Sequence, residues 1–132
     1  MKKRILSLAI SAALVLTMLP AGALAAGDKG KPPVYNKATG CYEISTPDQL
    51  LYLSGSWKDG TPRDGHYVLT ADIDMTGVKG FKPIASKKEQ GFIGTFDGQF
   101  HAIKGLRVEY EKKYAGLFGY VGNQNDQAYI KN

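Results

Sequence analysis

The sequence is poor in the residues that build disulfide frameworks and zinc sites, with one cysteine and two histidines among 132 residues. Cys41 alone cannot form an internal disulfide, so the chain is not a disulfide scaffold. Its neighbours alternate as in a strand, which favours a structural thiol over a nucleophile, since no base is adjacent in sequence. Neither His66 nor His101 lies in an H-E-x-x-H pattern, so the helix of a zinc peptidase is absent from this sequence.

Long apolar runs are also scarce, and the one that exists lies at the amino terminus. Three basic residues at positions 2–4 precede an apolar run over 5–19, and Ala23-Leu24-Ala25 has the small-residue pattern of a secretory cleavage site. A run of about 15 residues is too short to span a bilayer, which needs about 20. We predict a signal peptide over 1–25, a secreted or extracellular protein that can associate with the cell surface, and no membrane span after cleavage.

No large excess of positive or negative charge remains once the signal peptide is removed. The 17 Lys and Arg residues oppose 12 Asp and Glu, and three of the basic residues belong to the signal, which leaves 14 against 12, or a net charge of +2. Nucleic-acid binding requires a clustered basic face. The pairs Lys87-Lys88 and Lys112-Lys113 are interpreted as solvated loop charges, so no nucleic-acid partner is expected.

Removal of the signal leaves positions 26–132, enough for one small domain. The Gly-, Lys- and Pro-rich stretch 26–33 predicts a flexible leader, and the domain is expected over 34–132. Thr46-Pro47-Asp48-Gln49 has the pattern of a capping box with proline in the first helical position. We predict a helix that starts there and reaches Trp57, with one apolar stripe.

Short β segments separated by Gly, Pro and Asp fill the remainder. They are expected at 41–45, 67–70, 73–75, 81–85, 92–96, 100–108, 117–121 and from 130. Asp97-Gly98 is a hairpin signal that favours an antiparallel meander, with 92–96 paired to 100–108. Two glycines bracket two apolar residues in Gly91-Phe92-Ile93-Gly94 and again in Gly116-Leu117-Phe118-Gly119. A repeat with so short a period favours a parallel coil of stacked turns. Residues alone leave both open.

Four sequence blocks resemble the amino-terminal part of secreted bacterial proteins that carry GLUG-type repeats. They are ISTPDQL at 44–50, YVLTADID at 67–74, FDGQFHAI at 96–103 and AGLFG at 115–119, and the resemblance covers about 42–132. It implies a right-handed parallel β-helix on large exported or surface proteins. These include adhesin-like proteins and the non-catalytic leading region of immunoglobulin A1-specific metallopeptidases. Gln99-Phe100 replaces a small polar pair such as Asn-Gly, which predicts a less tight turn here.

Candidate sites are few. Asp72 to Gly77 has the D-x-D-x-T-G opening of a calcium loop, but Pro83 stands where the bidentate glutamate belongs, which favours a strand and turn. Asp72, Asp74 and Asp97 are the carboxylates available for polysaccharide cleavage, which needs a defined pair. Asp97 fits its own turn better. We assign no catalytic residue, no cofactor and no metal.

The histidine at position 101 and the tyrosines are the remaining candidates for binding residues. His101 is interpreted as packed or hydrogen-bonded at a turn edge. The tyrosines, among them Tyr110, Tyr114 and Tyr120, are candidates for a carbohydrate-stacking surface, although packing explains them equally well.

The sequence therefore predicts a mainly β protein: an N-terminal cap with one short helix that leads into the first rungs of a right-handed parallel β-helix. A small antiparallel β meander with one helix is the alternative fold. The expected function is a secreted or surface, adhesin-like structural module without catalysis, truncated at its carboxyl end. Its partners would be downstream repeats of the same protein and glycans or proteins of a host or cell wall. The alternatives are the leading part of an extracellular enzyme, either a polysaccharide-degrading β-helix or a metallopeptidase, and a carbohydrate-binding domain.

Overall fold

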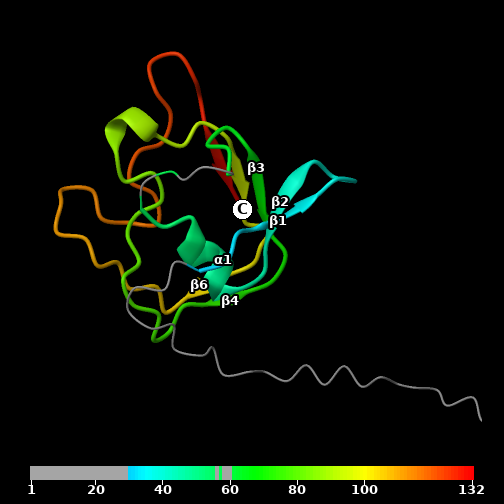
Figure 1. The fold of residues 1–132 in the computed structure, drawn as a ribbon, viewed down its shortest axis with the longest axis horizontal. Helices are drawn as coiled ribbons and strands as arrows, with labels where there is room; N and C mark the ends of the chain where they lie inside the picture. Colours follow the sequence, from blue (N-terminus) through cyan, green and yellow to red (C-terminus); the bar gives the residue numbers. More distant parts are fainter. Residues whose placement is uncertain (1–29, 56, 58–60) are drawn as a thin grey trace, which may run out of the picture.

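A computed structural model describes residues 30–55, 57 and 61–132, which form a mainly β fold with one short α-helix (Figure 1). The predicted signal peptide and residues 26–29 of the predicted leader lie outside this range. Within it, the chain before the first strand is held to the helix, because the N–H of Lys31 donates to the carbonyl of Asp48 at 3.2 Å. The elements are β1 (Val34–Asn36), β2 (Cys41–Ile44), α1 (Pro47–Tyr52), β3 (His66–Leu69), β4 (Ile73–Asp74), the 3-10 turn η1 (Lys88–Gln90), β5 (Thr95–Asp97), β6 (Ile103–Lys104) and β7 (Tyr129–Lys131).

Parallel pairing dominates the two sheets. The larger sheet has the order β1-β2-β3-β5-β7, in which only β1 and β2 are antiparallel, and β4 pairs with β6 in a second, parallel sheet. The antiparallel alternative suggested by Asp97-Gly98 is therefore wrong. β5 does not pair with β6, because the chain turns away after β5 and each of the two strands joins a different sheet.

We call the stretch of chain from one strand of the larger sheet to the next parallel strand a pass. The register places apolar residues of successive passes directly above one another. Tyr42 pairs with Tyr67, Tyr67 with Phe96, and Phe96 with Ile130, so the chain returns to the same position once in each pass. Isolated parallel bridges join Ile84 to Phe118 and Phe92 to Val121 as well.

The two glycine-bracketed blocks are therefore not equivalent positions of one repeat. Phe92 in the first block bridges Val121, which lies beyond the second block, and Phe118 in the second block bridges Ile84, which precedes the first. The spacing between the blocks is a coincidence of loop lengths. The blocks do meet in the interior, where the rings of Phe92 and Phe118 lie 5.4 Å apart.

The start of α1 agrees with the predicted capping box. The backbone N–H of Gln49 donates to Oγ1 of Thr46 at 3.3 Å, and Oε1 of Gln49 accepts from the N–H groups of Ser45 and Thr46 at 2.7 and 3.2 Å. The helix ends at Tyr52, not at Trp57, because Leu53 caps it and the chain then bridges to Ile84. A helix of six residues is too short to be stable alone, so packing of its buried leucines must hold it.

Aromatic rings fill the interior between the sheets. Tyr67 and Phe92 are almost fully buried with centroids 6.0 Å apart, and Trp57 lies 5.7 Å from Phe92. The hydroxyl of Tyr67 donates to the carbonyl of Pro62 at 2.8 Å, so this buried donor is satisfied. Burial raises the pKa of Tyr67, which keeps the phenol neutral in the core.

The turn after β5 is tight despite its unusual residues. The N–H of His101 donates to the carbonyl of Gly98 at 2.8 Å, and the N–H of Gln99 donates to Oδ1 of Asp97 at 2.9 Å. Gln99 and Phe100 have φ angles of 46° and 62°, in the left-handed region that glycine and asparagine tolerate best. The prediction of a looser turn was wrong, since the turn keeps its geometry and accepts backbone strain.

Relief of this strain gives a first prediction. Because the Phe100 side chain is 89% exposed, Phe100→Gly removes little packing and should stabilise the fold by about 1 kcal/mol. Phe100→Ala is the matched control, since alanine also lacks the ring but keeps the penalty for positive φ. Thermal melts should rank the glycine variant above the alanine variant. The reverse order would contradict strain at this turn.

Close approach of successive passes gives a second prediction. A Cβ atom added to Gly94 would lie 2.1 Å from the carbonyl oxygen of Gly65, whereas one added to Gly116 would meet nothing closer than 3.6 Å. Gly94→Ala should therefore cost about 1–3 kcal/mol through forced separation of the backbones. Gly116→Ala should change the stability by less than about 1 kcal/mol. Urea unfolding followed by circular dichroism measures both, and equal midpoints would contradict the parallel stacking.

Candidate functional site: the two ends of the strand stack and a lysine-tyrosine pocket

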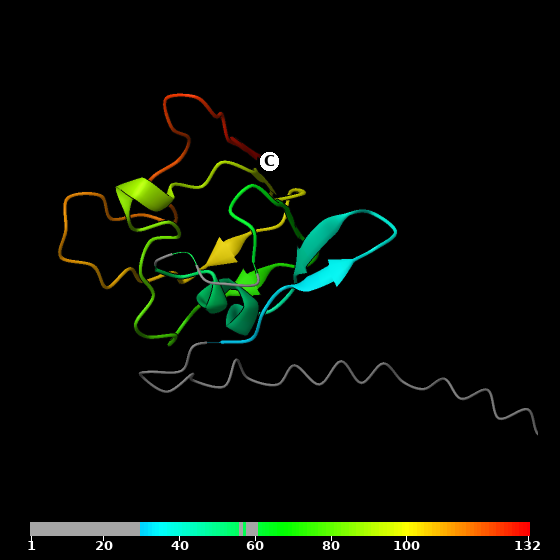
Figure 2. The same cartoon turned by 45° about the horizontal axis from the view of Figure 1, so that its top comes forward.

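At the first end of the larger sheet the strand β1 covers β2 and is itself the edge strand, with Val34 57% and Tyr35 50% exposed. β1 folds back on β2 as a hairpin, in which Nδ2 of Asn36 donates to Oε1 of Glu43 at 2.7 Å. The helix α1 comes directly after β2, just as β4 comes after β3 and β6 comes after β5. It lies beside β4 in both views (Figures 1 and 2). Leu50 and Leu51 are 0% and 4% exposed, so the helix closes the interior at this end.

The other end of the sheet is open. β7 is the last strand in the sheet order, and all three of its residues are exposed. Ile130 has the same register position as Tyr67 and Phe96 but is 49% exposed, against 0% and 4% for those two residues. A cavity of about 340 Å³ opens beside it, with walls from Leu69, Phe96, Gly98, His101, Ile103, Leu117, Ile130, Lys131 and Asn132.

The free edge of β7 also carries backbone groups. The N–H of Tyr129 donates to the carbonyl of Gly94 at 2.9 Å. Because N–H groups alternate in direction along a strand, the N–H of Ile130 points away from β5. This edge therefore offers a donor and a half-exposed apolar side chain to a further strand.

The three aspartates singled out in the sequence have separate local roles. Oδ1 of Asp72 accepts from the N–H of Ala102 at 2.9 Å and lies 3.3 Å from Nδ1 of His101, so it connects the segments before β4 and β6. Oδ1 of Asp74 accepts from the N–H of Thr76 at 2.9 Å. Oδ1 of Asp97 accepts from Nδ2 of Asn132 at 3.0 Å, which connects β5 to the end of β7.

These contacts lower the pKa of all three aspartates. The backbone N–H of Ala102 is the main cause for Asp72, the side chain and N–H of Thr76 for Asp74, and the side chain of Asn132 for Asp97. The general acid of a glycosidase needs a raised pKa, so the three shifts have the wrong direction for that role. Within the described residues no group of three His, Cys, Asp or Glu side chains is placed to hold a metal ion.

The remaining candidates from the sequence are dispersed. His66 is exposed at the start of β3, and Cys41 is half-buried at the start of β2, where its thiol donates to the carbonyl of Thr39 at 3.5 Å. His101 contacts Asp72, as expected for a hydrogen-bonded residue at a turn edge.

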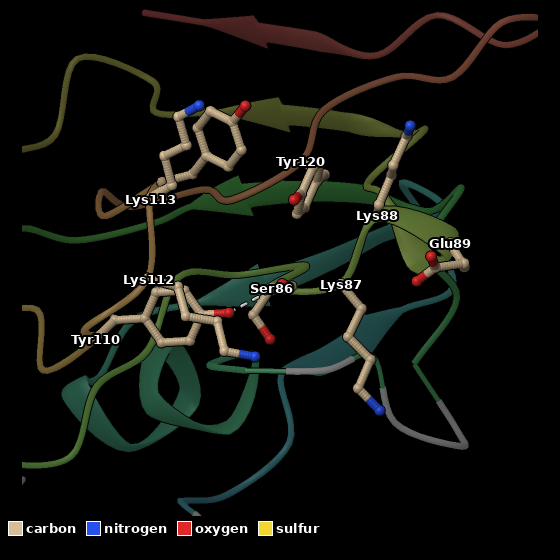
Figure 3. A pocket seen from close by; sticks show the side chains of 9 residues that line it. Ser86, Lys87, Lys88, Glu89, Tyr110, Lys112, Lys113 and Tyr120 are labelled. Carbon is tan, nitrogen blue, oxygen red and sulfur yellow. Dashed lines mark hydrogen bonds between the residues drawn. The ribbon is translucent and has the colours of Figure 1, made fainter.

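A pocket of about 420 Å³ brings together residues that the sequence analysis kept apart (Figure 3). Both lysine pairs and the three tyrosines line it: Lys87, Lys88, Lys112, Lys113, Tyr110, Tyr114 and Tyr120, together with Ser86 and Glu89. Interpretation of the lysines as separate loop charges missed this arrangement. The signal that could have found it is the presence of a Lys-Lys pair in each of two loops that parallel stacking makes neighbours, the second pair lying between Tyr110 and Tyr114.

Comparison with known proteins finds a relative among the curated sequences. The chain is 38% identical to Halomucin of Haloquadratum walsbyi over 86 residues, which covers 54% of this chain and 1% of Halomucin. The chain thus spans about 1% of the length of the curated relative that it matches. No model of a protein family and no solved structure matches the chain. Among residues 30–55, 57 and 61–132, no helix has the length and apolar character of a membrane span.

The lowered pKa values predict how stability depends on pH. An aspartate whose folded pKa lies below its unfolded value of about 3.9 contributes stability above that value. This contribution disappears as the pH falls through the lowered pKa. The melting temperature should therefore decline below about pH 4, and less steeply in an Asp72→Asn/Asp97→Asn variant.

Asp64→Asn is the control for this measurement, because Asp64 is exposed and has no hydrogen bond or ion pair with another described residue. Its melting temperature should fall with acid as in the unchanged protein. Parallel acid profiles for the double variant and the control would contradict a structural role of the two carboxylates.

Proposed function

We propose that this protein is a secreted, adhesin-like structural module that caps and starts a right-handed parallel β-helix of the GLUG type, without catalysis of its own. The observation that carries the proposal is the difference between the two ends of the sheet. At one end the antiparallel strand β1 and the helix α1 cover the parallel strands and the interior, whereas the other end presents the parallel strand β7 with Ile130 half-exposed. A module of this kind would begin a stack at one end and extend it at the other.

Recurrent order along the chain supports the β-helix. The passes β3-β4-Ile84 and β5-β6-Phe118 visit the same three positions, and each position is paired in parallel with its counterpart. Parallel crossover connections are right-handed as a rule, and the resemblance to GLUG-type proteins implies the same hand.

The geometry of the first pass supports the cap. In the first pass α1 replaces the strand that would otherwise precede β4 in the second sheet, and the leucines of α1 pack into the common core. An uncovered terminal pass would expose apolar side chains and unpaired backbone groups, which promotes association with other chains. A helix with its own capping box satisfies its backbone without a strand partner.

The partner of β7 is then a further strand of the same protein. That strand would pair with the outward N–H of Ile130 and cover the cavity beside it. The match with Halomucin supports this, because 54% of this chain corresponds to 1% of a far longer protein. The predicted signal peptide supports an extracellular location.

A test of the open end uses self-association. In a purified chain without residues 1–25, β7 should be the surface through which molecules associate, since its edge places the half-exposed Ile130 beside an open cavity. Ile130→Lys places a charge on that surface. It should raise the dissociation constant of the dimer about tenfold in sedimentation experiments. Hydrogen exchange should be fast at the amide of Ile130 and slow at that of Tyr129, which is bonded to Gly94.

Tyr35→Lys is the matched control at the opposite edge strand, where Tyr35 is 50% exposed and the hairpin ends the sheet. This variant should associate like the unchanged chain. A chain that stays monomeric at all concentrations, or equal effects of the two substitutions, would contradict an open end at β7.

A further inference from the structure

We infer that the lysine-tyrosine pocket is a binding site for an anionic glycan, a sugar chain that carries carboxylate or sulfate groups. The pocket lies between the segment around η1 and the loop before the bridge at Phe118, so two successive passes of the chain form its walls. In Figure 3, Lys87 and Lys88 line one side, Lys112 and Lys113 line the other, and Tyr120 lies between them.

The charge of the pocket is not neutralised by the protein. None of the four lysine ammonium groups lies within 4.0 Å of a carboxylate in the described part of the chain, although Glu89 also lines the pocket. The ion pairs of the described residues all involve Asp72 or Asp97, which lie outside the pocket. Four cations against one carboxylate attract an anion, and a concave wall strengthens the local field.

The tyrosines give the pocket a fixed floor. The hydroxyl of Tyr110 donates to the carbonyl of Ser86 at 3.2 Å, which ties the two walls together. The backbone of Tyr120 accepts from the N–H of Phe92 at 2.9 Å and donates to the carbonyl of Ala85 at 3.0 Å. Its ring meets that of Tyr114 edge-to-face at 5.4 Å. Rings fixed in this way offer apolar surface with a polar rim, which suits the face of a sugar.

Size and surroundings favour a short stretch of glycan over a nucleic acid. A pocket of about 420 Å³ has the volume of a small-molecule site. Nucleic-acid binding needs a basic track that follows many phosphates. Here the adjoining hollow is lined by Glu109 and Glu111 as well as Lys82 and Lys112, so the excess of positive charge does not continue into it. No arginine lines the pocket, and the bidentate contacts that favour phosphate are absent from it.

The test is calorimetric titration of the purified full chain with four probes. They are a sulfated heparin hexasaccharide, a hexamer of galacturonic acid, uncharged maltohexaose and a single-stranded DNA oligonucleotide. At least one anionic sugar should bind, with an affinity that falls as NaCl is raised, and the two anionic sugars distinguish sulfate from carboxylate. Lys88→Gln/Lys113→Gln should weaken this binding about tenfold, and Tyr114→Ala should weaken it severalfold.

Lys37→Gln/Lys79→Gln is the matched control, since it removes the same net charge from two exposed lysines outside the pocket. It should bind within about twofold of the unchanged chain, and unchanged melting temperatures should accompany all variants. The proposal is overturned if neither anionic sugar binds, if DNA or maltohexaose binds as tightly, or if the control variant weakens binding as much as the pocket variant. Because all these residues lie off β7, failure here leaves the proposed extension of the sheet intact, and failure there leaves the pocket intact.

Discussion

The parallel register of β2, β3, β5 and β7 is the constraint on which the rest of this structure depends. It places each pass directly on the previous one, so a residue must suit both its own strand and the residues above and below. Tyr42, Tyr67 and Phe96 share one position for this reason, and the rings of Tyr42 and Tyr67 stack at 5.1 Å. At the turns between strands, the same closeness leaves no room for a side chain at Gly94.

The register constrains strands but leaves the connections free to vary. Successive passes, which run over 42–67, 67–96 and 96–130, become longer without a change in strand pairing, so the added residues lie in loops. Those loops carry η1 in one pass and the segment around Lys112 in the next. Binding groups can therefore be added to a stacked fold at low cost in stability, because their backbones leave the core and return to it at fixed points.

Local features of this fold could be predicted from the sequence, and nonlocal ones could not. The capping box of Thr46 and Gln49 involves neighbours within one helical turn, and its residues alone specify it. Alternation located β2, β3 and β4, whereas the segments predicted as strands at 81–85 and 117–121 form only isolated bridges and the one predicted at 100–108 is the two-residue β6. The strands that pair are separated by a whole pass of the chain. The dipeptide Asp97-Gly98 is compatible with the parallel fold as well as with an antiparallel hairpin, so it does not distinguish the two. The alternation of residues carries no information about which strand lies beside it, so the sequence left the antiparallel pairing of β5 open as an alternative, which the structure contradicts.

The same limit applies to the candidate sites. Asp72 and Asp97 drew attention as a pattern of carboxylates, yet their contacts reach across to the next pass of the chain and satisfy backbone and side-chain donors. Lys88 and Lys112 belong to different passes, and only the stacking of those passes brings them to one pocket. The direction in which a lysine pair in a loop points depends on the positions of the core strands on either side of that loop, which the sequence alone does not give.

The open sheet end and the pocket are independent parts of one architecture. None of the pocket residues lies on β7, and none of the β7 residues lines the pocket. Addition of a further strand to β7 would bury Ile130 and close the cavity beside it, while the pocket stays on the loops of two earlier passes. Tyr120 belongs to the pocket alone, because its backbone is bonded to Phe92 and Ala85 and its ring lines the pocket.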